Sequence, residues 1–321
     1  MHKEVLEQHL HNGSIPRGHG IEGHIHRHFK HLIKKQEAED FKNIYFNQWA
    51  MNEVYCDLLV ALDQECSHTG IYPLALKGIT LLRDIYPDLG TRPMSDLDLL
   101  ITGSEKFKLE QCLLVLGFAK VHVETKWSAN NFKQHYHGTW RNTPLTIEVH
   151  EYLFSQFRAE QDFFARAHEF LPYHNIKKLN KEDTVLHLIG HLSYQHTFLK
   201  FFWSLDVLLY LQKYAHDIDW KKLSTNAQKL GLWQTHRMTL QCLGTHFDLI
   251  LPVAATKYFH LDKKMLTTYL LTPKFLLRKR NWGLRYFTIK HLTKDSLWQA
   301  IYYDILWGLS KIGIKGSYAT K

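Results

Sequence analysis

Apolar residues recur at helical spacing in the first and last parts of the chain and at strand spacing between them. Over residues 34–68 they fall at every third or fourth position, which predicts two helices or one broken helix. From about residue 160 to the end the pattern is again mostly helical. Over about 70–155, short apolar segments instead alternate with turn residues, a pattern typical of strands joined by short connections.

The middle region is therefore predicted to form a small mixed α/β unit. Its predicted strands and helices are, in order, strand 72–76, helix 79–85, strand 94–101, helix 107–116, and strands 119–125, 135–140 and 145–151. Asn142-Thr143-Pro144 is predicted to form the hairpin turn between the last two strands. The predicted fold class is α+β, with a small mixed β-sheet core, flanking helices and an all-helical C-terminal region.

Three segments are expected along the 321-residue chain. Residues 1–33 are polar and rich in Gly and His, and they are predicted to form an irregular, poorly ordered, solvated arm. A metal site at its histidines is the alternative, although no Cys or carboxylate ligands accompany them. These histidines are His24, His26, His28 and His31. Residues 34–155 are expected to hold the α/β core with its N-terminal helices, and residues 156–321 a helical domain with a basic tail.

Composition excludes several classes of protein. A hydrophobic content of 45% and an aromatic content of 13% indicate a globular chain with a sizeable core rather than a disordered one. No apolar run approaches the roughly 18 residues that a membrane span needs. The four cysteines are scattered without a CxxC pair, which favours free thiols and a cytoplasmic location.

The net charge of +9 is concentrated near the C-terminus. From Lys274 onward ten Lys and Arg residues stand against only Asp295 and Asp304. Such a tail suggests an anionic partner. The segment RKRNWGLRYF (278–287) could grip RNA or an anionic membrane face, whereas its interleaved aromatics could equally belong to a helical core.

The candidate chemistry begins at SDLDLLI (95–101), an apolar run that carries two aspartates. Because side chains alternate along a strand, Asp96 and Asp98 point to one face while the leucines point to the other. Two like charges beside a hydrophobic core repel each other and resist desolvation, so a neutralising cation is expected. The alternative is that both aspartates lie on the solvated face of an edge strand.

Glu148 supplies a third carboxylate. It lies in LTIEVHEYL (145–153), where the neighbouring apolar residues face the opposite side of the strand. If this strand pairs near the Asp96 strand, three carboxylates converge on one part of a sheet. Mg2+ and similar hard cations prefer oxygen ligands and complete their shell with substrate phosphates. The sequence thus predicts a site for Mg2+ or Mn2+ formed by Asp96, Asp98 and Glu148.

Basic residues near these carboxylates suit a phosphate-bearing ligand. Lys77-Gly78 falls at a predicted strand-to-helix turn, where backbone N–H groups and a lysine suit phosphate. Arg92 could bind phosphate oxygens in bidentate fashion or form an ordinary salt bridge. His150 shares the face of Glu148 and could contact phosphate or orient that carboxylate.

Other polar residues favour structural interpretations. His187 and His191 have a spacing found in zinc sites, but no HExxH glutamate or third ligand accompanies them, and packing between helices is favoured. Asp206 is predicted to cap a helix or pair with a structural partner.

The stretch LKGITLLRDIYPDLGTRPMSDLDLLI (76–101) resembles the signature of the uncharacterised nucleotidyltransferase family of the DNA polymerase β-like superfamily. Further similarity lies in IEVH (147–150), LHLIGHLSYQH (186–196), WSLD (203–206) and IDW (218–220). The resemblance implies a nucleotidyltransferase core in which Asp96, Asp98 and Glu148 hold the metal. It also implies that Lys77-Gly78 replaces the Gly-Ser phosphate turn of the superfamily, which is a departure from its usual pattern.

The function predicted from these features is Mg2+-dependent transfer of a nucleotidyl group from an NTP, with ATP the first candidate. The acceptor could be a protein, an RNA, a sugar or a small molecule. The alternative is a catalytically inactive nucleotidyltransferase fold that senses nucleotides or binds a partner.

Overall fold

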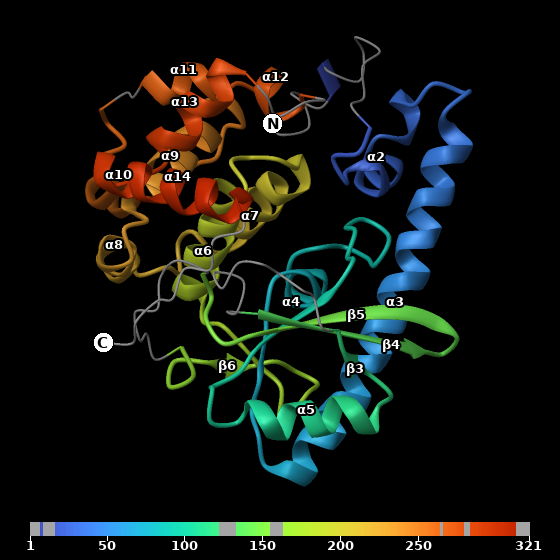
Figure 1. The fold of residues 1–321 in the computed structure, drawn as a ribbon. Helices are drawn as coiled ribbons and strands as arrows, with labels where there is room; N and C mark the ends of the chain where they lie inside the picture. The colour runs from blue at the N-terminus through green and yellow to red at the C-terminus, as the bar shows by residue number, and fades with distance from the viewer. Residues whose placement is uncertain are drawn as a thin grey trace. The chain divides into compact units, whose positions relative to one another are not determined.

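A seven-stranded mixed sheet forms the centre of the α/β part of the chain (Figure 1). The computed structural model describes residues 7–8, 17–121, 133–154, 163–263, 266–278 and 283–312. Helices precede the sheet along the chain and a helical region follows it. The protein is therefore α+β with a helical C-terminal region, as predicted from the sequence.

The strand order explains why SDLDLLI is so apolar. The strands are β1 (Leu74–Ala75), β2 (Leu97–Leu100), β3 (Ala119–Lys120), β4 (Lys133–Trp140), β5 (Thr143–His150), β6 (His168–Glu169) and β7 (Lys177–Lys178). They are arranged in the order β3-β4-β5-β2-β1-β7-β6. Strand β2 pairs in parallel with β5 and antiparallel with β1, so it is a central strand, and all four of its residues are buried. An apolar run is the composition that such a strand requires.

The β4–β5 hairpin turns one residue earlier than predicted. Its two central residues are Arg141 and Asn142, with φ of 47° and 62°, which is the left-handed pair that a two-residue hairpin turn needs. Thr143 and Pro144 already belong to β5 and lie opposite β4 residues. The predicted turn at 142–144 was therefore wrong, because Asn142 takes the second left-handed position rather than opening the turn.

The helices before β2 differ from the prediction in two places. Helix α3 (Ala38–Thr69) is one continuous 32-residue helix rather than two helices or one broken helix, and neither Gly nor Pro interrupts its sequence. Helix α2 (Glu22–His28) lies within the arm that was predicted to be irregular. Ile21, Ile25 and Phe29 recur at helical spacing and are at most 1% exposed, so an apolar stripe stabilises α2. Residues 1–6 and 9–16 of the arm lie outside the described residues.

Helices α3 and α5 (Lys106–Val115) contact the residues of β4 that face away from the acidic side chains. Tyr136 donates a hydrogen bond to Glu110 of α5, and Trp140 donates one to Asp57 of α3. These two aromatic residues alternate along β4 with Lys133 and His135, so they lie on the opposite face of the strand. One face of the sheet is thereby covered by helices, which leaves the other face to carry polar chemistry.

Two short helices, η1 (Lys30–Leu32) and α4 (Gly78–Asp84), come before β2. The helices that follow β7 give the C-terminal region its helical character. They are α6 (Lys181–Ile189), the π-helical η3 (Gly190–Gln195), α7 (Phe201–Tyr214), α8 (Trp220–Lys229), α9 (Trp233–His246), α10 (Val253–Phe259), α11 (Leu266–Leu270), α12 (Pro273–Leu276), α13 (Leu284–Leu292) and α14 (Leu297–Ile312). Within the described part of the chain, none of the helices has both the length and the apolar character needed to cross a membrane.

Two compact units alternate along the sequence. One lies within Met1–Glu53, Leu81–Met94 and Asn180–Asp295, and the other lies within Val54–Thr80, Ser95–Leu179 and Ser296–Lys321. All seven strands belong to the second unit. The predicted domain boundary near residue 155 stays a prediction.

Candidate functional site

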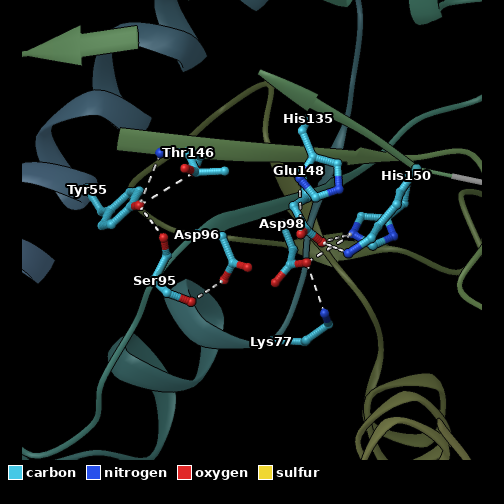
Figure 2. Close-up of polar contacts among 10 residues, drawn as sticks. Tyr55, Lys77, Ser95, Asp96, Asp98, His135, Thr146, Glu148 and His150 are labelled. Atoms are coloured by element: carbon cyan, nitrogen blue, oxygen red, sulfur yellow. Dashed lines mark hydrogen bonds and ion pairs between the residues drawn. The ribbon is translucent and has the colours of Figure 1, made fainter. Parts of the chain in front are cut away.

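Asp98 and Glu148 lie side by side on one face of the sheet. They are direct partners in the parallel ladder between β2 and β5, and each alternates along its strand with buried apolar residues that face the other way. Asp98 is 4% exposed and Glu148 is 7% exposed. Figure 2 shows the two carboxylates next to each other. The pairing of the Glu148 strand with the strand of Asp98 is present as the sequence suggested, and a metal site shared by Asp96, Asp98 and Glu148 stays a prediction.

His150 completes a compact group with these carboxylates. Its ring nitrogen Nε2 donates to Asp98 Oδ1 at 2.9 Å and lies 3.5 Å from Glu148 Oε2. Within the described part of the chain, one ligand atom from each of Asp98, Glu148 and His150 lies within 4.8 Å of the others, so these three residues could hold a metal ion. Asp96 precedes β2 and is not one of the three.

A lysine provides the first counter-ion for Asp98. Lys77 lies between β1 and α4 with a left-handed φ of 43°, and its Nζ donates to Asp98 Oδ1 at 2.9 Å. Burial disfavours the charge of Lys77, but the Asp98 carboxylate outweighs burial and raises the pKa of Lys77. Asp98 therefore has a cation supplied by the protein itself, Lys77, and a hydrogen bond from His150 on the same oxygen.

The same contacts keep the paired carboxylates ionised. Burial opposes ionisation of Asp98, but the Lys77 charge and the His150 hydrogen bond outweigh it and hold the pKa of Asp98 well below its usual range. For Glu148, burial is likewise outweighed, by hydrogen bonds from His150 and Lys133, and the pKa falls to about 2. Ionised carboxylates are the form that binds metal.

Asp96 differs from this pair. Burial and the neighbouring charge of Asp98 raise the pKa of Asp96 to about 6. Ser95 Oγ donates to Asp96 Oδ1 at 3.3 Å, and Tyr55 Oη donates to the Ser95 carbonyl at 2.8 Å, which ties this segment to α3 (Figure 2). A cation near Asp96 would favour its ionised form.

Two residues of β4 belong to the site although sequence reasoning did not find them. Lys133 Nζ donates to Glu148 Oε2 at 2.6 Å, and His135 Nδ1 lies 3.7 Å from Glu148 Oε1. His135 is the direct ladder partner of Glu148. The available signal was the alternation of basic residues at 133, 135 and 137, but the partner of that face depends on the strand register, which the sequence does not show.

Arg92 lies in the other compact unit, where it forms a buried ion pair. Its Nε and Nη2 donate to Asp206 Oδ1 and Oδ2, both at 2.8 Å, and Tyr86 Oη donates to Asp206 Oδ1 at 2.6 Å. Arg92 is 4% exposed and Asp206 is 1% exposed. The structural pairing predicted for Asp206 is confirmed, and Arg92 forms the salt bridge that the sequence offered as its alternative. The binding of phosphate by Arg92 stays a prediction.

His187 and His191 contribute to packing. They are 2% and 9% exposed, and their rings lie 6.3 Å apart. The ring of His191 also lies 4.8 Å from that of Trp203 on α7. These contacts confirm the packing role that the sequence favoured.

Several basic residues of the C-terminal region are engaged within the protein. Arg278 donates to the carbonyls of Thr197, Phe198 and Phe275 and lies over the Phe275 ring. Arg285 donates to carbonyls of α11, and Lys294 donates to the Tyr194 carbonyl at 3.1 Å. Lys279 and Arg280 lie outside the described residues. Part of the local positive charge thus satisfies backbone carbonyls rather than facing a partner.

The fold and the site together define an α+β protein with a metal-capable carboxylate pair on its sheet. A family model described as uncharacterised nucleotidyltransferase matches residues 16–248. The chain belongs to this nucleotidyltransferase family. No curated protein and no solved structure was found to match the chain.

Proposed function

We propose that the protein transfers a nucleotidyl group from an NTP to an acceptor in a reaction that depends on Mg2+ or Mn2+. The observation that carries the proposal is the buried, ionised pair of Asp98 and Glu148, set on adjacent parallel strands in a member of a nucleotidyltransferase family. Mg2+ and similar hard cations take carboxylate oxygens as ligands and complete their shell with water and substrate phosphates.

The donor set fits a divalent cation. Asp98 and Glu148 are ionised, and His150 offers a nitrogen within the same 4.8 Å group. Asp96 carries a carboxyl whose pKa is raised by burial and by the charge of Asp98. Asp98 and Glu148 would hold the ion, with Asp96 and His150 beside it. When bound, the ion would neutralise phosphate charge and lower the pKa of an attacking hydroxyl.

The protein's own groups have separable roles in this proposal. Lys77 would bind phosphate oxygens of the NTP, with Gly78 allowing close approach of the backbone. Glu148 would orient the acceptor hydroxyl or accept its proton, and His150 would hold Asp98 in place through the 2.9 Å hydrogen bond. Catalysis would come mainly from positioning and charge neutralisation.

A transfer assay tests the proposal without knowledge of the acceptor. The full chain would be incubated with Mg2+, a lysate of the source cells and each NTP labelled at the α-phosphate. Stable labelling of a macromolecule or small molecule, lost with Asp98→Asn, would support nucleotidyl transfer. The matched control is Asp57→Asn, because Asp57 pairs with Trp140 and Arg141 instead. Equal labelling by both variants would contradict the proposal.

A specific observation also favours the second function, a nucleotide sensor without turnover. Lys77 and Lys133 already neutralise Asp98 and Glu148 at 2.9 Å and 2.6 Å. In a sensor these lysines would remain on the carboxylates while nucleotide bound nearby. Nucleotide binding that needs no divalent ion and yields no pyrophosphate would favour this function over transfer.

A further inference from the structure

Each carboxylate of the site is paired with its own lysine. Lys77 Nζ lies 2.9 Å from Asp98 Oδ1, and Lys133 Nζ lies 2.6 Å from Glu148 Oε2. Both lysines belong to the compact unit that contains the sheet, one from the β1–α4 connection and one from the start of β4. We propose that Lys77 and Lys133 are exchangeable counter-ions, which leave the carboxylates for the phosphates of the nucleotide when a divalent cation and nucleotide bind together.

This inference rests on the proposed function and extends it in two ways. It assigns Lys133 to the nucleotide's phosphates, and it requires that metal and nucleotide bind with positive coupling. A divalent ion that binds alone must displace two ammonium groups and leave them near its own charge. A nucleotide triphosphate that binds with the ion supplies new anionic partners for both lysines. Coupling of this kind is reciprocal, so each ligand tightens the other by the same factor.

The exposure of the partners supports movement of the lysines rather than of the carboxylates. The side chains of Asp98 and Glu148 are 5% and 9% exposed, whereas those of Lys77 and Lys133 are 15% and 29% exposed. The carboxylates are fixed on paired strands. A lysine ammonium on its flexible four-carbon stem can change partners without a backbone shift.

Two neighbouring imidazoles contact the same carboxylates as the lysines. His150 shares Asp98 Oδ1 with Lys77, and His135 lies on the other oxygen of Glu148 from Lys133. Both Asp98 hydrogen bonds end on Oδ1, and from the described residues Oδ2 receives none. Departure of Lys77 therefore leaves Asp98 still oriented by His150, with its second oxygen available to a cation.

A second lysine–carboxylate pair of the same unit provides a matched control. Lys106 on α5 pairs with Glu151, which follows β5 and is not part of the metal-capable group of described residues. Lys106→Met removes one positive charge and one ion pair from the same unit. It differs from Lys133→Met because Glu151, the carboxylate that loses its partner, is not expected to bind the metal ion.

The test measures Mn2+ binding by electron paramagnetic resonance, with and without α,β-methylene ATP, which does not react at the α-phosphate. In the wild-type chain the analogue should tighten Mn2+ binding by about 10-fold or more, within the usual range of coupling. Lys133→Met should bind Mn2+ alone more tightly, bind the analogue more weakly, and lose most of the coupling. Lys106→Met should behave as wild type, and Lys133→Arg should restore affinity for the analogue.

Three results would overturn the inference. They are unchanged Mn2+ affinity and coupling in Lys133→Met, weaker Mn2+ binding by that variant, and the same changes in Lys106→Met. Thermal unfolding of each variant ensures that only folded protein is compared. The proposed function fails separately: coupled binding that responds to Lys133 but produces no pyrophosphate from natural NTPs would retain the counter-ion exchange and refute transfer.

Discussion

Glu148 lies directly opposite Asp98 across two parallel strands, and both carboxylates are buried and ionised. Lys77 and His150 hold Asp98 in that state, and hydrogen bonds from His150 and Lys133 hold Glu148 in it. This relationship concentrates negative charge at a fixed position on the sheet. It also sets the first expectation, since Mg2+ takes carboxylate oxygens as ligands and completes its shell with substrate phosphates.

Divalent ions together with an NTP should stabilise the folded protein. A ligand present at 100 times its Kd adds about 2.7 kcal/mol to the free energy of unfolding, because it binds only the native state. Thermal unfolding in Mg2+ and ATP should therefore occur several degrees higher than in EDTA and ATP. Glu148→Gln should lose this difference, whereas Asp57→Asn should keep it. An equal shift in Glu148→Gln would place the ion elsewhere.

The alternation of apolar and polar residues was sufficient to predict which face of the sheet carries Glu148. Because successive side chains of a strand point to opposite faces, the sequence alone predicted that Glu148 and its neighbours Ile147 and Val149 lie on opposite faces of the sheet. The pairing of β2 with β5 then brings Glu148 to Asp98. Lys133 could not be assigned in this way, because its contact with Glu148 depends on the register of β4 against β5.

One long-range pair and one local turn were also not predicted from the sequence. Arg92 and Asp206 are 114 residues apart, and no local pattern links an arginine in a loop to an aspartate in an apolar helix. The turn at Arg141-Asn142 was missed by one residue, since Asn and Pro both signal turns and their order alone did not fix the register.

Breaking the Arg92–Asp206 pair should destabilise the fold strongly. Removal of one partner of a buried ion pair typically costs about 3–5 kcal/mol, because the remaining charge has no partner. Arg92→Ala should lower the free energy of unfolding by that amount in urea titrations. Arg141→Ala, which removes an exposed partner of Asp57, should change it by about 1 kcal/mol or less. If Arg92→Ala instead kept full stability and weakened NTP binding, Arg92 would act at the nucleotide rather than in the fold.

The free energy of unfolding should fall as the pH is lowered from 6.5 to about 4, because the buried His236 takes up a proton less readily in the folded protein than in the unfolded chain. His236 is fully buried in α9, and burial lowers its pKa from 6.5 to about 4. Above pH 6.5 the imidazole is neutral in both the folded and the unfolded protein, so it does not make the free energy of unfolding depend on pH. Between pH 6.5 and 4 the unfolded chain binds the proton first, so the free energy of unfolding decreases. The full loss is about 3 kcal/mol below pH 4.

The free energy of unfolding, measured by urea titration at a series of pH values, checks this sign. His236→Gln should show a shallower loss between pH 6.5 and 4 than the wild type, whatever its stability at pH 7. The control is His31→Gln at an exposed position, which should retain the wild-type slope. A wild-type slope in His236→Gln would show that other groups dominate the acid response.

The basic C-terminal region makes a separate prediction about the acceptor. Arg278 is bound to backbone carbonyls, so its replacement should lower stability and is unsuited to a test of partner binding. Lys279→Gln/Arg280→Gln should leave NTP affinity unchanged and slow transfer to an anionic acceptor, and wild-type transfer should weaken with salt. Transfer rates over a salt series check this. Rates identical to wild type at every salt concentration would leave these two residues without a role in acceptor binding.

Pyrophosphate release tests the central claim most directly. With Mg2+, an NTP and its acceptor, the wild-type protein should release pyrophosphate in proportion to the nucleotide transferred. Asp98→Asn and Glu148→Gln should each reduce that release by at least about 100-fold, as expected when the groups that position the reacting phosphate lose their charge. Asp57→Asn should retain it. Pyrophosphate release that persisted at the wild-type rate in Asp98→Asn and Glu148→Gln would contradict the assignment of this carboxylate pair as the catalytic centre.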